Sequence, residues 1–311
     1  MKKVILTGIK PTGVPHLGNY LGAIKPALEQ ANDTSFFFIA DYHAINQTAC
    51  AKTLRETTKQ VACIWLACGL DPQKTVFYKQ SDVPEIFELA TILMGVTPKG
   101  LMDRAHAYKA AKDENRAVNM GLYTYPILMA ADILIMNTAF VPVGQDQQQH
   151  VEIAADIAKA FNAVYGKTLV EPQFVIKRDV GTIMGLDGRK MSKSYNNVIP
   201  LFCDEAELLK SIKRIATDST APDAPKDRGH LIFQLYKHFT NTDLDNKIGW
   251  GDAKQKLFEA INAYIAPMRE KYNYYMTNFS EVDKILSAGS TRARKVARET
   301  MDRVRKSIGV Q

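Results

Sequence analysis

The stretch Gly8-Ile-Lys-Pro-Thr-Gly-Val-Pro-His-Leu-Gly-Asn-Tyr20 separates a short apolar run from a segment with apolar residues at helical spacing. Residues 3–7 are largely apolar and β-branched, which is typical of a buried parallel strand, and residues 20–28 form the helical segment. A strand, a glycine-rich turn and a helix N-terminus place backbone N–H groups and the positive end of the helix dipole against an anion. The glycine spacing fits neither a GxGxxG dinucleotide loop nor a P-loop. This stretch therefore predicts an anion site of another kind.

The alternation of strand and helix continues along the chain. Apolar runs at residues 35–40 and 75–78 indicate strands, and periodic segments at 54–68 and 84–94 indicate helices. This alternation with short polar links predicts an α/β fold: a doubly wound, Rossmann-like parallel sheet in a catalytic domain over residues 1–200.

Two parts of the chain depart from this alternation of strands and helices. A polar, alanine-rich and basic stretch near residues 99–120 predicts a helical insertion. Only helical patterns follow, so residues 201–311 are expected to form a C-terminal helical domain, with separate helices at 281–286 and 290–308. The last helix has an apolar stripe, and its basic residues predict either a solvated face or an RNA-binding one. These basic residues are Arg292, Arg294, Lys295, Arg298, Arg305 and Lys306.

Composition limits the kinds of function. The 311 residues are 46% hydrophobic and 23% charged, as in an ordinary globular protein, and are enough for two domains. A net charge of +7 and a pI near 9.0 favour a polyanionic partner without identifying it. None of the four cysteines forms a CxxC pair, so we expect no zinc or iron–sulfur site. No apolar run approaches the roughly 20 residues of a membrane span, and no signal-peptide pattern is present, so we expect a cytoplasmic protein.

A second glycine-rich stretch, Gly185-Leu-Asp-Gly-Arg-Lys-Met-Ser-Lys-Ser194, is also suited to phosphate binding. Its two glycines allow tight turns, and Lys190 and Lys193 supply ammonium groups. Ser192, Ser194 and backbone N–H groups add further donors. A solvated basic turn is the alternative for any two lysines three residues apart. The spacing of the two lysines alone does not decide between these alternatives.

One apolar helix carries a carboxylate. In Tyr123-Thr-Tyr-Pro-Ile-Leu-Met-Ala-Ala-Asp-Ile-Leu134, Pro126 suits the first turn of a helix. Tyr125, Met129 and Asp132 are then spaced i, i+4 and i+7 and share one face. A buried carboxylate needs hydrogen-bond partners, which are either nearby backbone groups or a ligand. Because an indole N–H is a donor only, such an acceptor with apolar walls would suit tryptophan.

The order of strand, glycine and polar helix start recurs in Phe140-Val-Pro-Val-Gly-Gln-Asp-Gln-Gln-Gln-His150. Val141 and Val143 alternate along the strand and would form an apolar pocket wall. Gly144 would allow a ribose to approach the backbone closely. Asp146 could accept hydrogen bonds from both ribose hydroxyls, and Gln147 could bind the polar groups of an amino acid.

Two histidines border these segments. His43 follows the second strand, at the edge where open α/β sheets bind ligands, so a role in the site and a structural role are both open. His150 lies in the polar helix start and is expected to be structural.

These motifs resemble those of one enzyme family. Lys190-Met-Ser-Lys-Ser194 matches the KMSKS loop of class I aminoacyl-tRNA synthetases, and Pro15-His-Leu-Gly-Asn19 is similar to their HIGH motif with asparagine as its last residue. The order GIKPTGVPHLGN, TYPILMAADIL, VPVGQDQQQH and GLDGRKMSKS resembles the bacterial tryptophanyl-tRNA synthetases over most of the chain. The resemblance implies a ligase that activates tryptophan with ATP, releases pyrophosphate and transfers the amino acid to tRNA(Trp). It also implies a homodimer, Mg²⁺ carried by the ATP phosphates, and a C-terminal domain that reads the anticodon, with its last helix packed back on the catalytic domain.

The resemblance also assigns roles to residues. Catalysis is expected from His16, Lys190 and Lys193. Tryptophan is expected to contact His43, Tyr125, Met129, Asp132, Val141, Val143 and Gln147. ATP is expected to contact Lys10, Pro11, Thr12, Gly18, Asn19, Gly144, Gln145, Asp146, Ile183, Lys190, Met191, Ser192, Lys193 and Ser194.

Two positions depart from the family pattern. Lys10 stands where the best-known bacterial members have glutamine. Ala111 stands where some members have lysine, so Lys109 or Lys112 could take over its contact with phosphate.

Other functions are open at this stage. The chain could be a ligase for another aromatic amino acid, chiefly tyrosine, or an inactive paralogue that binds RNA or senses tryptophan. It could also be a small-molecule adenylyltransferase with a HIGH-like turn. Both phosphate lysines argue against an inactive paralogue, and the long helical tail argues against an adenylyltransferase.

Overall fold

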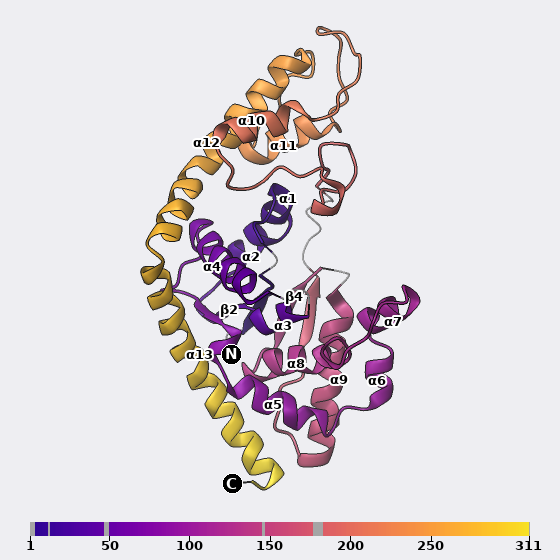
Figure 1. Cartoon of the computed structure of the whole chain (residues 1–311), viewed down its shortest axis with the longest axis vertical. Coiled ribbons are helices and arrows are strands. Elements are labelled where there is room, and N and C mark those ends of the chain that lie inside the picture. The colour runs from indigo at the N-terminus through magenta and orange to yellow at the C-terminus, as the bar shows by residue number, and fades with distance from the viewer. Residues whose placement is uncertain (1–3, 12, 47–49, 145–146, 177–182, 311) are drawn as a thin grey trace.

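The computed structural model describes residues 4–11, 13–46, 50–144, 147–176 and 183–310. Within these residues, the centre of the molecule is a parallel sheet of five strands in the order β3–β2–β1–β4–β5 (Figure 1). The strands are β1 Ile5–Ile9, β2 Ser35–Ile39, β3 Val76–Lys79, β4 Phe140–Val143 and β5 Gln173–Ile176.

The predicted α/β fold with a doubly wound parallel sheet is confirmed. The first three strands lie within two residues of the predicted runs. The fifth strand was not predicted, because its four residues Gln173–Ile176 form too short a run to stand out from a loop.

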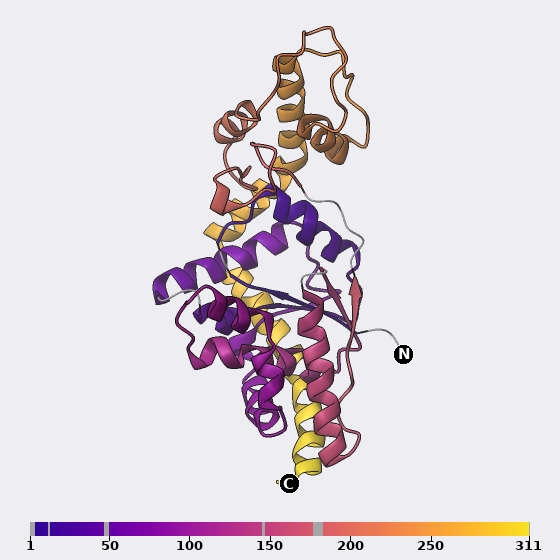
Figure 2. The ribbon, with the colours of Figure 1, turned by 90° about the vertical axis from the view of Figure 1, so that its right-hand side faces the viewer.

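Successive side chains of β2 enter two different cores, as the alternation of a strand requires. Phe37 and Ile39 join one cluster, and Phe36 and Phe38 join the other. Helices cover both faces of the sheet (Figure 2). One face packs against η1 Tyr20–Ile24, α2 Lys25–Glu29 and α4 Ala51–Ala67, and the other against α5 Glu85–Met94, α8 Met120–Ile135 and α9 Gln148–Tyr165. The remaining helical elements are α1 Leu17–Asn19, α3 Asp41–Ile45, η2 Gln80–Asp82, α6 Lys99–Asp103, α7 His106–Asp113, η4 Lys193–Tyr195, α10 Glu205–Lys213, α11 Leu231–Thr240, α12 Trp250–Thr277 and α13 Phe279–Ile308.

The prediction that Pro126 occupies the first turn of its helix was wrong. The helix α8 begins six residues earlier, at Met120, and Pro126 lies in its interior. Its start is fixed by Asn119, whose side chain accepts a hydrogen bond from the N–H of Leu122 at 2.8 Å. An asparagine cap satisfies a backbone donor directly, and it outweighs the statistical preference of proline for the first turn.

The prediction of two helices at the C-terminal end was also wrong. A single helix, α13, runs from Phe279 to Ile308, and Gly289 lies within it. Glycine usually weakens a helix interior, but this one is required by packing. A Cβ on Gly289 would lie only 1.8 Å from the carbonyl oxygen of Phe77 in β3.

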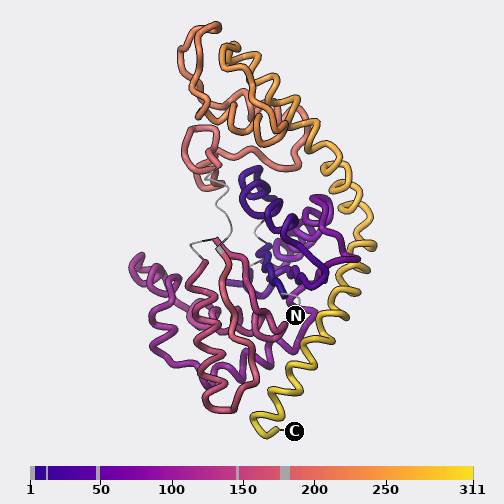
Figure 3. The backbone as a smooth tube through the Cα atoms, turned by 180° about the vertical axis from the view of Figure 1, so that it is seen from behind, coloured from indigo at the N-terminus to yellow at the C-terminus, as the bar shows by residue number. Residues whose placement is uncertain are grey.

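The helices α10 and α11 and the start of α12 lie at one end of the molecule, and α13 continues from α12 along the sheet to the other end (Figures 1 and 3). There it contacts the edge strand β3 and the helix α5. Its apolar stripe is buried against the sheet core through Ala293, Ala297, Met301 and Val304.

Four basic residues of α13 contact β3, α5 or the residue before β3, where a solvated or RNA-binding face was predicted. Arg294 and Arg298 both donate to the buried carboxylate of Glu85, at 2.9 and 3.1 Å. Arg305 pairs with Glu88 at 2.6 Å, and Arg292 donates to the backbone oxygen of Thr75 at 3.0 Å. Sequence spacing could not reveal these partners, because they lie about two hundred residues away.

We predict that Gly289→Ala separates α13 from β3 and lowers the free energy of unfolding by about 1–3 kcal/mol, the usual cost of overpacking a core. Chemical denaturation would measure this loss. The matched control is Gly251→Ala in α12, where a Cβ would meet no atom within 4 Å. Because alanine favours helices over glycine, Gly251→Ala should leave stability unchanged or raise it by up to about 1 kcal/mol. Equal stabilities for the two variants would contradict the close packing of α13.

Candidate active site

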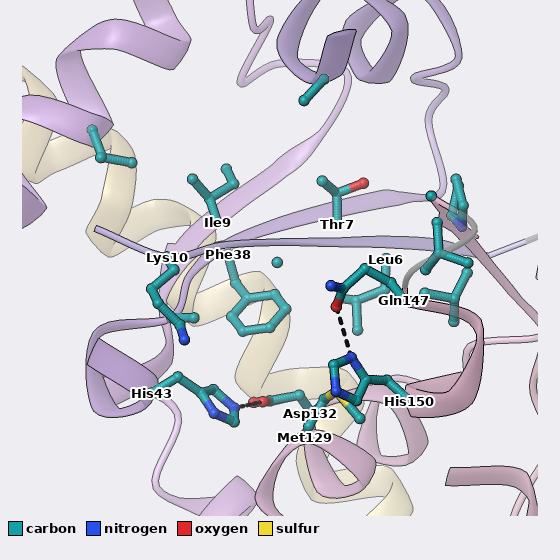
Figure 4. A pocket seen from close by; sticks show the side chains of 18 of the residues that line it. Leu6, Thr7, Ile9, Lys10, Phe38, His43, Met129, Asp132, Gln147 and His150 are labelled. Atoms are coloured by element: carbon teal, nitrogen blue, oxygen red, sulfur yellow. Dashed lines mark hydrogen bonds and ion pairs between the residues drawn. The ribbon is translucent and has the colours of Figure 1, made fainter. Parts of the chain in front are cut away.

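A pocket of about 510 Å³ opens at the carboxyl ends of β1 and β4 (Figure 4). These two strands are neighbours, but the chain proceeds from β1 towards β3 on one side and from β4 to β5 on the other. Ligands of open α/β sheets bind at such a change of direction, because the loops leaving the two strands diverge and leave a crevice. Residues from the ends of both strands line this pocket, among them Lys10 and Gly144.

Asp132 is a fully buried carboxylate that borders this pocket. Its Oδ2 lies 2.9 Å from Nε2 of His43. The side-chain amide of Gln80 donates to both carboxylate oxygens, at 2.9 and 3.0 Å. Burial raises the pKa of Asp132, and the hydrogen bonds from His43 and Gln80 act in the opposite direction. Three separate elements, α8, α3 and η2, therefore meet at one carboxylate.

A hydrogen-bonded chain crosses the other side of the pocket. The hydroxyl of Tyr125 lies 2.8 Å from Nε2 of His150, and Nδ1 of His150 lies 2.7 Å from Oε1 of Gln147. Because the amide oxygen can only accept, Nδ1 of His150 carries the proton, and in the neutral ring Nε2 accepts from the Tyr125 hydroxyl. His150 thus connects two residues that were predicted to bind tryptophan, and it lines the pocket itself.

The first glycine-rich loop is closed by a reciprocal cap. Asn19 donates its N–H to Nδ1 of His16 at 3.2 Å, and the N–H of His16 donates to Oδ1 of Asn19 at 3.1 Å. Burial, and then the positive charge of Lys193, lower the pKa of His16 to about 4. His16 is therefore neutral near pH 7, as an acceptor from a backbone N–H must be.

The second loop is organised by the buried side chain of Asn197. Its amide donates to Asp187 at 2.7 Å and to the backbone oxygen of Lys190 at 3.1 Å, and it accepts from the N–H of Ser192 at 2.8 Å. Hydrogen bonds from Asn197, and then from Arg189, lower the pKa of Asp187 to about 2. One amide thus holds both ends of the segment that carries the first lysine of the motif.

The two loops touch each other. Met191 is buried, and its sulfur accepts from the N–H of Gly18 at 3.3 Å. The N–H of Leu17 donates to the backbone oxygen of Ile199 at 2.8 Å. A Cβ on Gly13 would lie 3.5 Å from the amino group of Lys193, so this ammonium lies beside the first loop.

The pocket brings together many of the predicted site residues. All seven predicted tryptophan contacts line it, and so do four predicted ATP contacts: Lys10, Asn19, Gly144 and Lys193. The other described residues of the ATP and catalytic sets lie outside its lining, in or next to the two loops, namely Pro11, His16, Gly18, Ile183, Lys190, Met191, Ser192 and Ser194. Thr12, Gln145 and Asp146 lie outside the described residues.

Three further observations concern the remaining predictions. On α7, Ala111 is fully buried, whereas Lys109 and Lys112 are exposed and are not part of the pocket lining. Within the described ranges, no group of three histidine, cysteine, aspartate or glutamate residues could hold a metal ion. Of the helices that the structure describes, none has both the length and the apolar character needed to cross a membrane.

Sequence reasoning missed Gln80 and Asn197. A signal for Gln80 was present, since it directly follows the third predicted strand, at the same edge of the sheet that drew attention to His43. Asn197 follows the basic loop in a polar run, Ser194-Tyr-Asn-Asn197, and nothing there separates a buried asparagine from an exposed one.

Comparison with known proteins identifies the class. Residues 2–266 match the family described as tRNA synthetases class I (W and Y). The chain belongs to this family, whose two letters stand for tryptophan and tyrosine.

Proteins named for tryptophan are among its relatives in sequence and structure. A tryptophan–tRNA ligase of Bordetella parapertussis is 48% identical over 332 residues, which cover 100% of this chain and 74% of that ligase. The tryptophan–tRNA ligase of Neisseria meningitidis is 46% identical and is covered to 98%, again over 100% of this chain. The crystal structure of tryptophanyl-tRNA synthetase from Campylobacter jejuni, complexed with ADP and tryptophan, is 43% identical and superposes with a TM-score of 0.91, covering 98% of this chain and 99% of that one.

We predict a pH dependence of stability that originates at His16. Its folded pKa of about 4 lies below the value of 6.5 of an unperturbed histidine. The unfolded chain therefore binds the proton first, so stability falls as the pH falls from 6.5 towards 4. His16→Asn retains an acceptor but cannot titrate, so its free energy of unfolding should fall less between pH 7 and pH 5. The exposed residue His106 provides the control, and His106→Asn should behave like the wild type. An unchanged drop in His16→Asn would contradict this assignment.

Proposed function

We propose that this chain is a tryptophan–tRNA ligase that activates tryptophan with ATP and transfers it to tRNA(Trp). The observation that carries the proposal is the buried carboxylate of Asp132 in an apolar pocket at the change of chain direction in the sheet. The two glycine-rich loops lie next to the mouth of the crevice expected for a nucleotide. Full-length similarity to tryptophan–tRNA ligases supports the same function.

The pocket has the two features that an indole requires. Met129, Val141 and Val143 supply apolar surface for the ring, and Asp132 supplies an acceptor for its N–H group. An indole nitrogen can only donate, so a carboxylate that already accepts from the Gln80 amide is a matching partner. We assign Gln147 and Tyr125, on the opposite side, to the amino and carboxylate groups of tryptophan.

We assign ATP to the space between the two loops. Lys10 and Lys193 line the pocket, and burial lowers the pKa of both amino groups. Gly144 at the end of β4 would allow the ribose to approach, and the phosphates would lie against the loop of Lys190 and Lys193. Mg²⁺ would enter with ATP as part of the substrate, held by the phosphates.

The chemistry requires alignment more than acid–base catalysis. In the first step a carboxylate oxygen of tryptophan attacks the α-phosphorus of ATP, and pyrophosphate leaves with the electron pair of the broken P–O bond. The carboxylate is already ionised at neutral pH and needs no general base. The lysines of the second loop would stabilise the charge that builds up on the leaving phosphates. In the second step a ribose hydroxyl at the end of tRNA attacks the activated carbonyl, and AMP leaves.

We assign tRNA recognition to the helical domain of residues 201–311. Four arginines of α13 already bind the catalytic domain. The cations that remain for RNA phosphates in this domain therefore lie mainly on the end formed by α10, α11 and α12. Lys210, Lys213 and Arg214 are exposed there, and phosphate contacts of this kind position RNA without reading its sequence.

We also propose a homodimer, formed through an exposed apolar surface on α3, α5 and the start of α8. Tyr42, Ile45, Met94 and Met120 are large apolar residues on this surface with 45–70% exposure. The ring centroid of Tyr42 in α3 lies 4.4 Å from that of Phe87 in α5. The start of α8 is close to the end of α3, since a Cβ on Gly121 would meet the side chain of Asn46. Such a patch on a globular protein is typical of an association surface.

Amino-acid-dependent exchange of pyrophosphate into ATP tests the function. We expect exchange with tryptophan and not with tyrosine or phenylalanine, each supplied alone without tRNA. Lys193→Ala should lower the exchange rate by about 10²–10³-fold, because a charge that is needed mainly in the transition state is lost. Tryptophan affinity, measured by equilibrium dialysis, should be unchanged. Lys159→Ala, an exposed lysine on α9, is the control.

Two results of this assay would contradict the proposal. Exchange with tyrosine alone would exclude the indole role of Asp132, and exchange with none of the three amino acids would exclude the ligase function. A comparable loss of exchange rate and tryptophan affinity in Lys193→Ala would contradict its assignment to the phosphates.

Sedimentation velocity tests the homodimer. The wild type should sediment as a dimer at micromolar concentration, and Ile45→Glu should sediment as a monomer, because a buried unpaired charge is costly. Val164→Glu on α9 is the control, since Val164 is also an exposed apolar residue but lies away from the proposed surface. Dissociation by both variants or by neither would contradict this surface.

A further inference from the structure

Gln80 is a fully buried glutamine whose side chain lies behind the pocket, against Asp132. It directly follows the edge strand β3 and begins the short helix η2. Its amide group contacts two elements: the carboxylate of Asp132 in α8 and the backbone of Tyr42 in α3. Because Gln80 does not itself line the pocket, any influence on a bound amino acid acts through Asp132.

The orientation of the Gln80 amide is fixed by chemistry. The N–H of Tyr42 donates to Oε1 of Gln80 at 3.2 Å and also to Oδ1 of Asp41 at 3.0 Å. A backbone N–H can only donate, so the amide oxygen must face Tyr42 and the NH₂ group must face Asp132. The NH₂ group lies 2.9 Å from Oδ1 and 3.0 Å from Oδ2 of that carboxylate. An amide NH₂ cannot accept a hydrogen bond, so both oxygens act as acceptors at this contact.

The other neighbour of Asp132 lacks this property. Nε2 of His43 lies 2.9 Å from Oδ2, but an imidazole nitrogen can donate or accept, depending on its tautomer. Among the described residues, Oδ1 accepts a hydrogen bond from Gln80 alone. Gln80 is therefore the neighbour that defines this carboxylate as an acceptor, and Oδ1 retains capacity for one more donor.

We propose that Gln80 is a positioning residue that determines specificity for tryptophan, by holding Asp132 as a fixed acceptor for the indole N–H. This inference rests on the proposed function. A protonated Asp132 would present a hydroxyl, and its neutral carboxyl group would be a weaker partner for the indole. A freely rotating carboxylate would lose entropy on binding the ligand. The hydrogen bonds from Gln80 act against both the protonation and the free rotation of the Asp132 carboxylate.

The titratable groups around Asp132 define the expected pH dependence. His43 and Asp41 belong to α3, and Tyr78 belongs to β3. Burial raises the pKa of Asp132, and the negative charge of Asp41 adds to this, whereas His43 and Gln80 lower it. Removal of the Gln80 amide should therefore raise the pKa of Asp132. As the pH is lowered, the variant should then begin to lose tryptophan affinity at a higher pH than the wild type does.

The test compares two substrates that differ in one donor. Tryptophan and its sulfur isostere β-(3-benzothienyl)alanine have similar shape, but only tryptophan has a ring N–H. In Gln80→Met the KM for tryptophan in pyrophosphate exchange should rise about tenfold, while the KM for the isostere changes less than about twofold. The acid limb of kcat/KM for tryptophan should move to higher pH.

A second variant, with a side chain of nearly the same shape as glutamine, should show the opposite pH dependence of the KM for tryptophan. In Gln80→Glu, a protonated carboxyl can donate to Asp132 in place of the amide, but two ionised carboxylates repel each other. The KM for tryptophan in Gln80→Glu should therefore rise as the pH rises, whereas in Gln80→Met it should rise as the pH falls. Because glutamate matches glutamine in size, this arm applies even where Gln80→Met folds poorly.

Gln255→Met is the matched control. Gln255 donates from its amide to a glutamate carboxylate, Glu259, at 2.9 Å, but on the exposed surface of α12. Its substitution should leave both KM values and the pH profile unchanged. A disturbance of folding is followed by thermal melting of each variant.

The outcomes separate this inference from the proposed function. Wild-type exchange with tryptophan supports the function whatever the variants do. Equal KM increases for tryptophan and the isostere in Gln80→Met would show a merely structural role for Gln80, and so would unchanged pH profiles in both variants. Either result would overturn the inference while leaving the ligase function in place.

Discussion

A carboxylate without exposure to solvent must be given hydrogen-bond donors by the protein, since its hydration is lost. At Asp132 the amide of Gln80, at the end of β3, is such a donor, and Nε2 of His43 in α3 lies within hydrogen-bond distance. The two residues follow neighbouring parallel strands, so they reach the same edge of the sheet. Asp132 arrives there from α8, which packs on one face of the sheet. The position of the pocket and the presence of an acceptor at its wall therefore depend on the contact between α8, α3 and η2 at Asp132.

The nucleotide side of the site depends on contacts between distant segments. The stretch after the second loop runs beside the first loop, with Leu17 donating to Ile199 and Leu201 donating to Pro15. Met191 packs under Gly18 and belongs to the same hydrophobic cluster as Phe37 and Ile39, which continues into α10, α11 and α12. The two lysines of the second loop are thus attached to a hydrophobic core and not to a freely moving turn. Electrostatic stabilisation of phosphates benefits from such preorganised charges.

Structure could be predicted from the sequence where it depends only on residues that are close together in the chain. The strands at residues 35–40 and 75–78 follow from apolar β-branched and aromatic runs, and the shared face of Tyr125, Met129 and Asp132 follows from helical periodicity. These features need only neighbours in the chain.

Predictions failed or were missing where a distant contact determines the structure. Separate helices were predicted at residues 281–286 and 290–308, but Gly289 between them lies inside one helix and allows α13 to touch the backbone of Phe77. The arginines of α13 looked like a solvated or RNA-binding surface, but their partners Glu85 and Glu88 lie on α5. Gln80 and Asn197 are common polar residues, and their importance follows only from what they reach in the folded chain. Spacing along a sequence contains none of this information.

The position of α13 also has a consequence for biosynthesis. The strand β3 is at one edge of the sheet, and its outer side is covered by a helix that begins two hundred residues later in the chain. An uncovered edge strand is a template for pairing with other chains. While the protein is being translated, this edge stays open until nearly the whole polypeptide has left the ribosome. The nascent chain is thus exposed to aggregation for most of its synthesis, and a chain shortened before α13 would keep that exposed edge permanently.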